Sequence, residues 1–274
     1  MIVVVGTPAW RPVEPAGPAG LACGIALAAA SAGAVVELVG RTGDDPAGDA
    51  LLIALARAGA HVVAVARTQG GLEELDDEIR KDGSSATLVP LSLTDTDGIA
   101  RLGAALYERG GKLDILVGNA GVPGPSSPLG HIEVKQWTDA FAVNVTANFQ
   151  LIRCMEPLLK QSDAGRAVFL TSGTAARADA YLGPYAASKA ALETLVRVWA
   201  NETRSLPLRV NLFDPGPIRT RMRATVFPGE DPMTLETPDQ PAAFIVKMCT
   251  PEWTATGKLY DYKSRSLLDF RAPA

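Results

Sequence analysis

The sequence predicts an α/β protein with a doubly wound parallel sheet and helices on both faces. Two observations support this prediction. Short runs rich in valine, isoleucine and leucine recur along the chain, and most are followed by a longer stretch with helical spacing of apolar residues. Strands that alternate with helices in this way form parallel sheets that are covered on both sides. The 274 residues are 47% hydrophobic, which is enough material for one large core.

The first sixty residues predict two successive β-α units. Ile2–Val5 is a β-branched run typical of a buried strand, and Gly20–Ser31 is an alanine-rich stretch that favours a helix. Val35–Val39 predicts the next strand, and Asp49–Ala58 predicts the helix that follows it. We expect the first of these units to be an extra N-terminal β-α unit.

The rest of the chain repeats the alternation. The expected strands are Val62–Ala66, Thr87–Leu91, Asp114–Val117, Ala167–Leu170, Arg209–Phe213 and Lys258–Tyr260. The expected helices are Leu72–Lys81, Gly98–Arg109, Val134–Leu159, a helix from Tyr185 to about Arg204, and Ala242–Met248. The Pro-rich stretch Pro228–Pro241 predicts a surface loop or lid. Parallel sheets bind ligands beyond the carboxyl ends of their strands, so the site is expected there.

Composition narrows the class of partner. The net charge of −4 disfavours nucleic acid or an anionic membrane as the main partner. Three widely spaced cysteines favour a reducing, cytoplasmic compartment, and two histidines cannot form a histidine-rich metal site. No apolar run approaches the ~20 residues that a membrane span requires, and the N-terminus lacks the basic region of a signal peptide. We therefore expect a small-molecule partner and no metal.

The segment Tyr185-Ala-Ala-Ser-Lys189 carries the clearest chemical signal. Residues four apart on a helix lie on one face, so the phenol and the ammonium group are neighbours. A positive charge within about 4–6 Å favours the phenolate and lowers the phenol pKa, which would make Tyr185 a proton donor and acceptor near neutral pH. An ordinary surface helix with this spacing is the alternative interpretation, and the remaining motifs decide between the two.

From about His61 onward, those motifs occur in a fixed order. Gly118-Asn-Ala-Gly121 follows a predicted strand, Asn144 lies in a predicted helix, and Ser172 ends the run Val-Phe-Leu-Thr-Ser. The Tyr-x-x-x-Lys pair comes next, and Pro215-Gly-Pro-Ile-Arg-Thr220 follows the strand after it. Together these motifs resemble the short-chain dehydrogenase/reductase family, over roughly four fifths of the chain. The resemblance implies a Rossmann-like fold and NAD(P)-dependent oxidation or reduction of an alcohol or carbonyl.

The resemblance also implies roles for particular residues. Tyr185 would exchange a proton with the substrate oxygen, Ser172 would hydrogen-bond that oxygen, and Lys189 would lower the Tyr185 pKa and hold the ribose. Asn144 would anchor a water that carries the proton to solvent. Taken alone, Asn144 could be an ordinary helix asparagine, Ser172 a strand-end cap and Asn119 a turn residue. The implied assembly is a homodimer or homotetramer. The residues expected to contact the cofactor are Gly40, Gly43, Gly48, Arg67, Asn119, Ala120, Gly121, Lys189, Pro215, Gly216, Ile218 and Thr220.

The N-terminal part departs from the family pattern. The expected Thr-Gly-x-x-x-Gly-x-Gly turn is missing, and Val39-Gly-Arg-Thr-Gly-Asp-Asp-Pro-Ala-Gly48 stands in its place. This stretch, with its surroundings in residues 1–59, resembles the N-terminal part of ribokinase-like sugar kinases. The kinase's ATP-binding half is absent, so phosphotransfer is rejected. The chain is therefore interpreted as a hybrid, with a kinase-like segment at residues 1–59, integrated into the same sheet, and an oxidoreductase body at residues 60–274.

Two placements of the N-terminal segment are possible. In the preferred one, Val35–Gly59 supplies the first strand and helix of the family sheet; in the other, Ile2–Gly6 supplies the strand. In the preferred placement Asp44 and Asp45 lie near the pyrophosphate. A like charge some ~5 Å away costs about 3 kcal/mol at an effective dielectric constant of ~20, or about a hundredfold in affinity. Impaired cofactor binding is therefore expected, unless both carboxylates point to solvent or cap a helix. The alternative function is a catalytically inactive hybrid.

Arg67 bears on which dinucleotide is used. It follows the strand Val62–Ala66, where an acidic residue would bind the ribose 2′-hydroxyl and an arginine suits a 2′-phosphate. NADP is therefore favoured, NAD stays possible, and a merely solvated Arg67 is the alternative. Ser92 stands where the family often has an aspartate near the adenine.

Overall fold

The structure is a computed structural model that describes residues 35–41 and 46–270. Within them an eight-stranded sheet has the order β3-β2-β1-β4-β5-β6-β7-β8. Neighbouring strands run parallel, except for the antiparallel pair β7 and β8. The strands are β1 (Val35–Arg41), β2 (His61–Ala66), β3 (Ala86–Pro90), β4 (Ile115–Gly118), β5 (Arg166–Leu170), β6 (Arg209–Asp214), β7 (Leu259–Asp261) and β8 (Ser266–Leu268).

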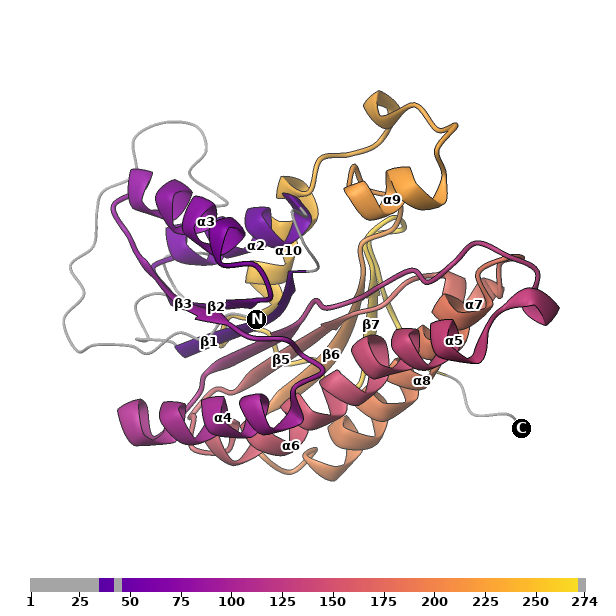
Figure 1. Cartoon of the computed structure of the whole chain (residues 1–274). Coiled ribbons are helices and arrows are strands. Elements are labelled where there is room, and N and C mark those ends of the chain that lie inside the picture. The colour runs from indigo at the N-terminus through magenta and orange to yellow at the C-terminus, as the bar shows by residue number, and fades with distance from the viewer. Residues whose placement is uncertain (1–34, 42–45, 271–274) are drawn as a thin grey trace.

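Helices cover both faces of this sheet, as the sequence predicts (Figure 1). One layer contains α2, α3 and α10, and the other contains α4, α6 and α8. The helices are α2 (Pro46–Arg57), α3 (Gln69–Lys81), α4 (Thr96–Gly110), α5 (Val134–Phe141), α6 (Ala147–Leu159), α7 (Thr174–Arg177), α8 (Gly183–Glu202), α9 (Arg221–Val226) and α10 (Asp239–Met248).

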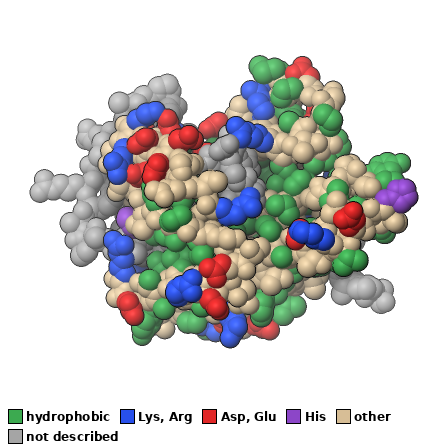
Figure 2. Space-filling view, viewed as in Figure 1, with side chains coloured by type: hydrophobic (Ala, Val, Ile, Leu, Met, Phe, Trp, Pro, Cys, Tyr) green, Lys and Arg blue, Asp and Glu red, His purple; other side chains and the backbone are tan. Residues whose placement is uncertain are grey.

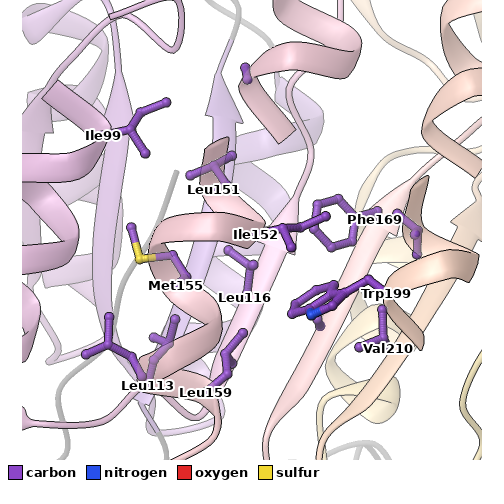
Figure 3. Packing of buried hydrophobic residues seen from close by; sticks show 14 of the residues in the cluster. Ile99, Leu113, Leu116, Leu151, Ile152, Met155, Leu159, Phe169, Trp199 and Val210 are labelled. Atoms are coloured by element: carbon purple, nitrogen blue, oxygen red, sulfur yellow. The ribbon is translucent and has the colours of Figure 1, made fainter. Parts of the chain in front are cut away.

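Each layer of helices has its own hydrophobic core, because alternate residues of a strand point to opposite faces. In β2, Val63 and Val65 face one core while Val62 and Ala64 face the other. The first core, between the sheet and α4, α6 and α8, is centred on Leu151, Met155, Phe169 and Trp199 (Figure 3). The rings of Phe169 and Trp199 meet edge to face, with centroids 6.1 Å apart. This packing fixes α6 and α8 against β4 and β5.

The first strand and helix of the sheet come from the segment that the preferred placement predicts. β1 pairs with both β2 and β4, and α2 follows it. The helix begins at Pro46, earlier than the expected Asp49, because proline is well suited to the first turn of a helix. The expected extra β-α unit, Ile2–Val5 with Gly20–Ser31, lies outside the described residues.

The single helix expected over Val134–Leu159 is interrupted. A turn of π-helix at Ala142–Thr146 separates α5 from α6 and has Asn144 at its centre. Hydrophobic spacing alone cannot reveal one inserted residue, and such π turns frequently mark functional sites. Other short elements were also not expected, among them α7, α9 and the edge strand β8.

The stretch Pro228–Pro241, expected to be a surface loop, contains a 3-10 turn at Pro232–Thr234 and the start of α10. Residues 219–235, here called the lid segment, also include α9, which precedes that stretch. A parallel bridge joins Ile218 to Glu236 at the base of the segment. Arg219 donates through its backbone to the carbonyl of Glu236 and through its guanidinium to those of Pro232 and Leu235. None of the described helices is long and apolar enough to cross a membrane.

Candidate active site

The predicted site residues gather at the carboxyl edge of the sheet. The strand order reverses between β1 and β4, which is where parallel sheets of this kind bind ligands. The turn Asn119-Ala120-Gly121 follows β4, Ser172 lies two residues beyond β5, and Pro215–Thr220 follows β6. Tyr185 and Lys189 lie in the first two turns of α8.

Tyr185, Ser172 and Lys189 form one cluster, as their spacing predicts. The hydroxyl groups of Tyr185 and Ser172 are hydrogen-bonded to each other. The Lys189 Nζ lies 5.8 Å from the centre of the Tyr185 ring and donates to the carbonyl oxygen of Leu170 at 2.8 Å. Because Leu170 is the last residue of β5, this bond ties α8 to the strand that leads into Ser172.

The expected low pKa of Tyr185 is not found. The pKa of Tyr185 is raised to about 12: burial raises it most, the hydrogen bond with Ser172 lowers it, and the nearby carboxylate of Asp214 raises it. Burial lowers the pKa of Lys189 to about 8, while Asp214 and Glu193 act in the opposite direction. Desolvation disfavours the charged form of both groups, and this outweighs the attraction between them that the sequence spacing suggested.

Asn144 joins three segments at the π turn. Its side-chain Oδ1 accepts from the backbone of Val122 at 2.8 Å, and its Nδ2 donates to the Val122 carbonyl at 3.0 Å and to Ser188 Oγ at 2.8 Å. Its own backbone carbonyl accepts from Asn148 Nδ2 at 2.8 Å. Asn144 is fully buried, so these bonds hold the turn after β4 against α8. The water-anchoring role expected of Asn144 stays a prediction.

The turn after β4 passes close to the Lys189 ammonium group. A Cβ built on Gly121 would lie 3.4 Å from Lys189 Nζ and 3.7 Å from Asn144 Oδ1. Ala120 is buried in the first core. The turn after β4 therefore lies in contact distance of Lys189 and Asn144.

The Pro-Gly turn after β6 is shaped by an aspartate that the sequence reasoning missed. Gly216 has a φ of 67°, which favours glycine, and its N–H donates to Asp214 Oδ1 at 2.9 Å. Thr220 caps α9 by accepting from the backbone of Arg223. Glu193 was also missed, although it lies one helical turn after Lys189; its carboxylate accepts from Thr171 Oγ1 at 2.7 Å. A carboxylate just before a Pro-Gly turn was the available sequence signal for Asp214.

The other predicted cofactor residues lie along the same edge, farther from the cluster. Gly40 is in β1, Gly48 is buried in the first turn of α2, and Arg67 is exposed directly after β2. The amino end of α2 follows β1, and its position at this edge of the sheet is that of a helix terminus whose dipole favours an anion. Gly43, Asp44 and Asp45 lie outside the described residues.

Comparison with known proteins identifies this arrangement. The family model "short chain dehydrogenase" matches residues 43–231, more than half of the chain. The chain belongs to the short chain dehydrogenase family. The uncharacterized oxidoreductase YciK of Escherichia coli K12 is 36% identical over 186 residues, which are 67% of this chain and 73% of YciK.

Solved structures of short chain dehydrogenases agree with this assignment. One from Shigella flexneri, complexed with NADP, has a TM-score of 0.79 and 32% identity, and the match covers 83% of this chain and 96% of that protein. One from Escherichia coli CFT073, complexed with NADPH, has a TM-score of 0.78 and 33% identity, covering 82% and 95%.

The short chain dehydrogenase match begins earlier in the sequence than the expected oxidoreductase body. The sequence interpretation began the oxidoreductase body at about residue 60, but the family match already begins at residue 43. It includes α2 and Gly48, which were assigned to a kinase-like segment. The helix that follows the first strand is therefore part of the family fold, and no feature of this helix requires a kinase origin.

Proposed function

We propose that this protein is an NADP-dependent oxidoreductase that interconverts a carbonyl and an alcohol on a small molecule. The observation that carries the proposal is the hydrogen bond between the hydroxyls of Tyr185 and Ser172, with the Lys189 ammonium 5.8 Å from the Tyr185 ring. Two hydroxyl groups that converge in this way can both reach one substrate oxygen.

The protein's own residues supply the proton chemistry. The Tyr185 pKa of about 12 keeps the phenol protonated at neutral pH, so it can donate a proton to a carbonyl oxygen during reduction. Ser172 donates a hydrogen bond to the same oxygen and stabilises the charge that develops there. Lys189, charged below about pH 8, lies where it can return a proton to Tyr185 and hold ribose hydroxyls.

Several donors along the carboxyl edge of the sheet fit NADP. Arg67 is exposed directly after β2, and an arginine there would suit the 2′-phosphate that two similar proteins solved with NADP or NADPH also accommodate. The amino end of α2 suits a pyrophosphate, and the turns at Asn119–Gly121 and Pro215–Thr220 suit the nicotinamide end. When bound, the nicotinamide would supply or accept the hydride.

Replacement of the Tyr185 hydroxyl tests the proposal directly. Wild-type protein should consume NADPH with a panel of aldehydes and ketones, measured by the absorbance of the reduced nicotinamide. Tyr185→Phe should lower kcat by about 10²–10⁴-fold, the usual contribution of a general acid. NADPH binding, measured by calorimetry, should persist in the variant. Full turnover in Tyr185→Phe would show that Tyr185 is not the proton donor.

One sequence feature favours a second candidate, a folded but inactive protein. Asp44 and Asp45 replace the neutral residues of the family's glycine turn, and carboxylates beside a pyrophosphate weaken its binding. Titration with NADPH of wild type and of the double variant Asp44→Asn, Asp45→Asn distinguishes an active oxidoreductase from a folded but inactive protein. Micromolar binding by wild type supports the enzyme, whereas binding only by the double variant supports the inactive protein.

We further propose that the protein forms a homodimer or homotetramer. Light scattering tests the assembly, and a clean monomer would contradict it.

We retain a distinct origin only for the part of residues 1–59 that precedes the family match. Removal of residues 1–34 tests whether this N-terminal segment is needed for folding. If the segment is an addition to the family fold, the shortened chain should still fold and bind NADPH.

A further inference from the structure

We propose that Asp214 is a positioning residue for the reaction, because it joins the loop that carries Ser172 to the Pro-Gly turn after β6. This inference rests on the proposed function. Asp214 is the last residue of β6 and is buried. Its role is separate from that of Tyr185, Ser172 and Lys189, since it contacts backbone rather than substrate.

The carboxylate binds two backbone N–H groups from different loops. Gly216 donates to Oδ1 at 2.9 Å, and Gly173, the residue directly after Ser172, donates to the same carboxylate. The position of Gly173 is tight on that side: a Cβ built there would lie 3.1 Å from Asp214 Oδ2 and 2.2 Å from Arg177 Nη1. The two loops thus approach each other through Asp214, and a shift of either one moves the other.

A carboxylate is required for this arrangement. It offers acceptors on both oxygens, whereas an asparagine amide offers one acceptor oxygen and one donor nitrogen. Asp214→Asn replaces one acceptor oxygen by an NH₂ donor and removes the negative charge that both glycine N–H groups face. The isosteric variant therefore weakens the contact between the two loops without leaving a cavity.

Asp214 also sets the charge around the catalytic pair. Lys189 and Glu193 from α8, Arg177 from α7 and Asp261 from β7 all interact electrostatically with it. Its charge raises the pKa values of both Tyr185 and Lys189. Loss of that charge should lower the Lys189 pKa further below its ordinary value, so that the ammonium is lost at lower pH.

Asp214→Asn and a matched control test the inference. The control is Asp76→Asn at the other side of the sheet, where a buried carboxylate also accepts a backbone N–H, from Ala86 at 2.8 Å, and pairs with Arg80. In Asp214→Asn, kcat should fall about tenfold, as expected for one lost hydrogen bond to a charged group. The alkaline limb of kcat/KM should move to lower pH. Asp76→Asn should change neither.

A second readout does not depend on activity. Hydrogen exchange of the Gly173 and Gly216 amides should be faster in Asp214→Asn without cofactor, and unchanged in Asp76→Asn. If Asp214→Asn folds poorly, Asp214→Ser, which keeps one acceptor, is judged by the same measurements. If the Asp214 variant has the kinetics, the pH profile and the amide hydrogen exchange of wild type, this inference is wrong while the proposed function still stands. A wild-type protein that neither binds nor oxidises NADPH would instead overturn the proposed function, and this inference with it.

Discussion

The Lys189 ammonium group is buried, which changes its pKa, and it is held by a hydrogen bond to the backbone. Burial lowers its pKa from the usual 10.5 to about 8, while the Leu170 carbonyl accepts one of its protons. The charged form is therefore present below about pH 8 and is lost as the pH rises through that value. Tyr185, with a pKa of about 12, remains protonated over the same range. The two residues thus titrate in separate windows.

The pH dependence of carbonyl reduction should report Lys189. We expect kcat/KM to decline above about pH 8, well below the pH at which an ordinary lysine would lose its charge. Lys189→Arg, which stays charged, should lower activity but remove this limb of the profile. A decline that begins only above pH 10 in wild type would contradict the assignment.

Arg67 should discriminate between the two dinucleotides. If its guanidinium binds the 2′-phosphate, Arg67→Ala should raise the Kd for NADPH roughly 10- to 100-fold, the value of one charged hydrogen bond, and leave NADH binding unchanged. Calorimetry with both cofactors measures this. Arg57→Ala is the control, because Arg57 ends α2 and pairs with Asp82. If Arg67→Ala weakens the binding of NADPH and NADH equally, Arg67 does not select between the two cofactors.

At this scale the sequence predicted which candidate site residues meet, but not their charge state. Helical spacing is enough to bring Tyr185 and Lys189 together, because the local geometry of a helix is fixed. Their pKa values depend on burial by distant segments, which no local pattern contains. Asp214 was missed for a similar reason. Its partners are the backbone N–H groups of Gly173 and Gly216, and a sequence does not show which backbone groups a side chain will contact.

Among the elements, β4 connects the hydrophobic core directly to the candidate active site. Its last residue, Gly118, lies directly before Asn119, and a Cβ there would lie 2.2 Å from the Phe169 ring and 2.9 Å from Asn148 Oδ1. Phe169 in turn packs on Trp199 of α8. The strand therefore has no room for a side chain at the point where the chain enters the site.

Gly118→Ala should therefore destabilise the protein by about 1–3 kcal/mol, as overpacking of a core usually does. It should also weaken NADPH binding, since the displaced backbone leads into the Asn119–Gly121 turn. Thermal melting and calorimetry measure the two effects. Gly70→Ala is the control: it lies in the first turn of α3 with nothing within 4 Å of its Cβ position. There alanine should stabilise the helix by up to about 1 kcal/mol.

Element boundaries were predictable where composition changes sharply and not elsewhere. The strands at Val62–Ala66 and Ala167–Leu170 were found to within one residue, because their apolar runs are bounded by polar residues. The π turn at Asn144 was not, because the flanking segments keep helical spacing on both sides of it. The strand Ser266–Leu268 is too short to stand out, and its antiparallel pairing with β7 depends on the rest of the sheet.

The molecule as a whole depends on contacts between its centre and its C-terminal part. Arg166 begins β5 and is buried, and its guanidinium donates to the carbonyls of Thr250 and Pro251, which follow α10. It also donates to the carbonyls of Gly165 and Pro207. Burial lowers the pKa of Arg166, and these carbonyls accept four hydrogen bonds from its guanidinium. One side chain thus ties the middle of the sheet to the segment that leads into β7.

Arg166→Leu should leave several buried carbonyl oxygens without donors and lower the free energy of unfolding by about 3–5 kcal/mol. Thermal or urea unfolding measures this. Arg153→Leu on the exposed side of α6 is the matched control and should change stability by less than about 0.5 kcal/mol. Equal stability of the two variants would show that the Arg166 contacts contribute nothing net.

The strand order of the whole sheet was accessible from sequence mainly through the family resemblance. Alternating strands and helices predict a parallel sheet, but they do not say which neighbouring strand β1 joins. The preferred placement of Val35–Gly59 was correct because this segment directly precedes β2, and a short connection favours adjacent strands. The arrangement of Ile2–Val5 and Gly20–Ser31 stays a prediction.

The bridge between Ile218 and Glu236 has a consequence for redesign. Because the two ends of the lid segment meet there, residues 219–235 leave the sheet and return to nearly the same point. A replacement of different length or composition would only need to keep those two anchoring positions. The β6 frame and the buried side chains beneath it would be unaffected. The part of the lid segment after Thr220 could therefore be exchanged as an insert while β6 and the predicted site residues stay in place.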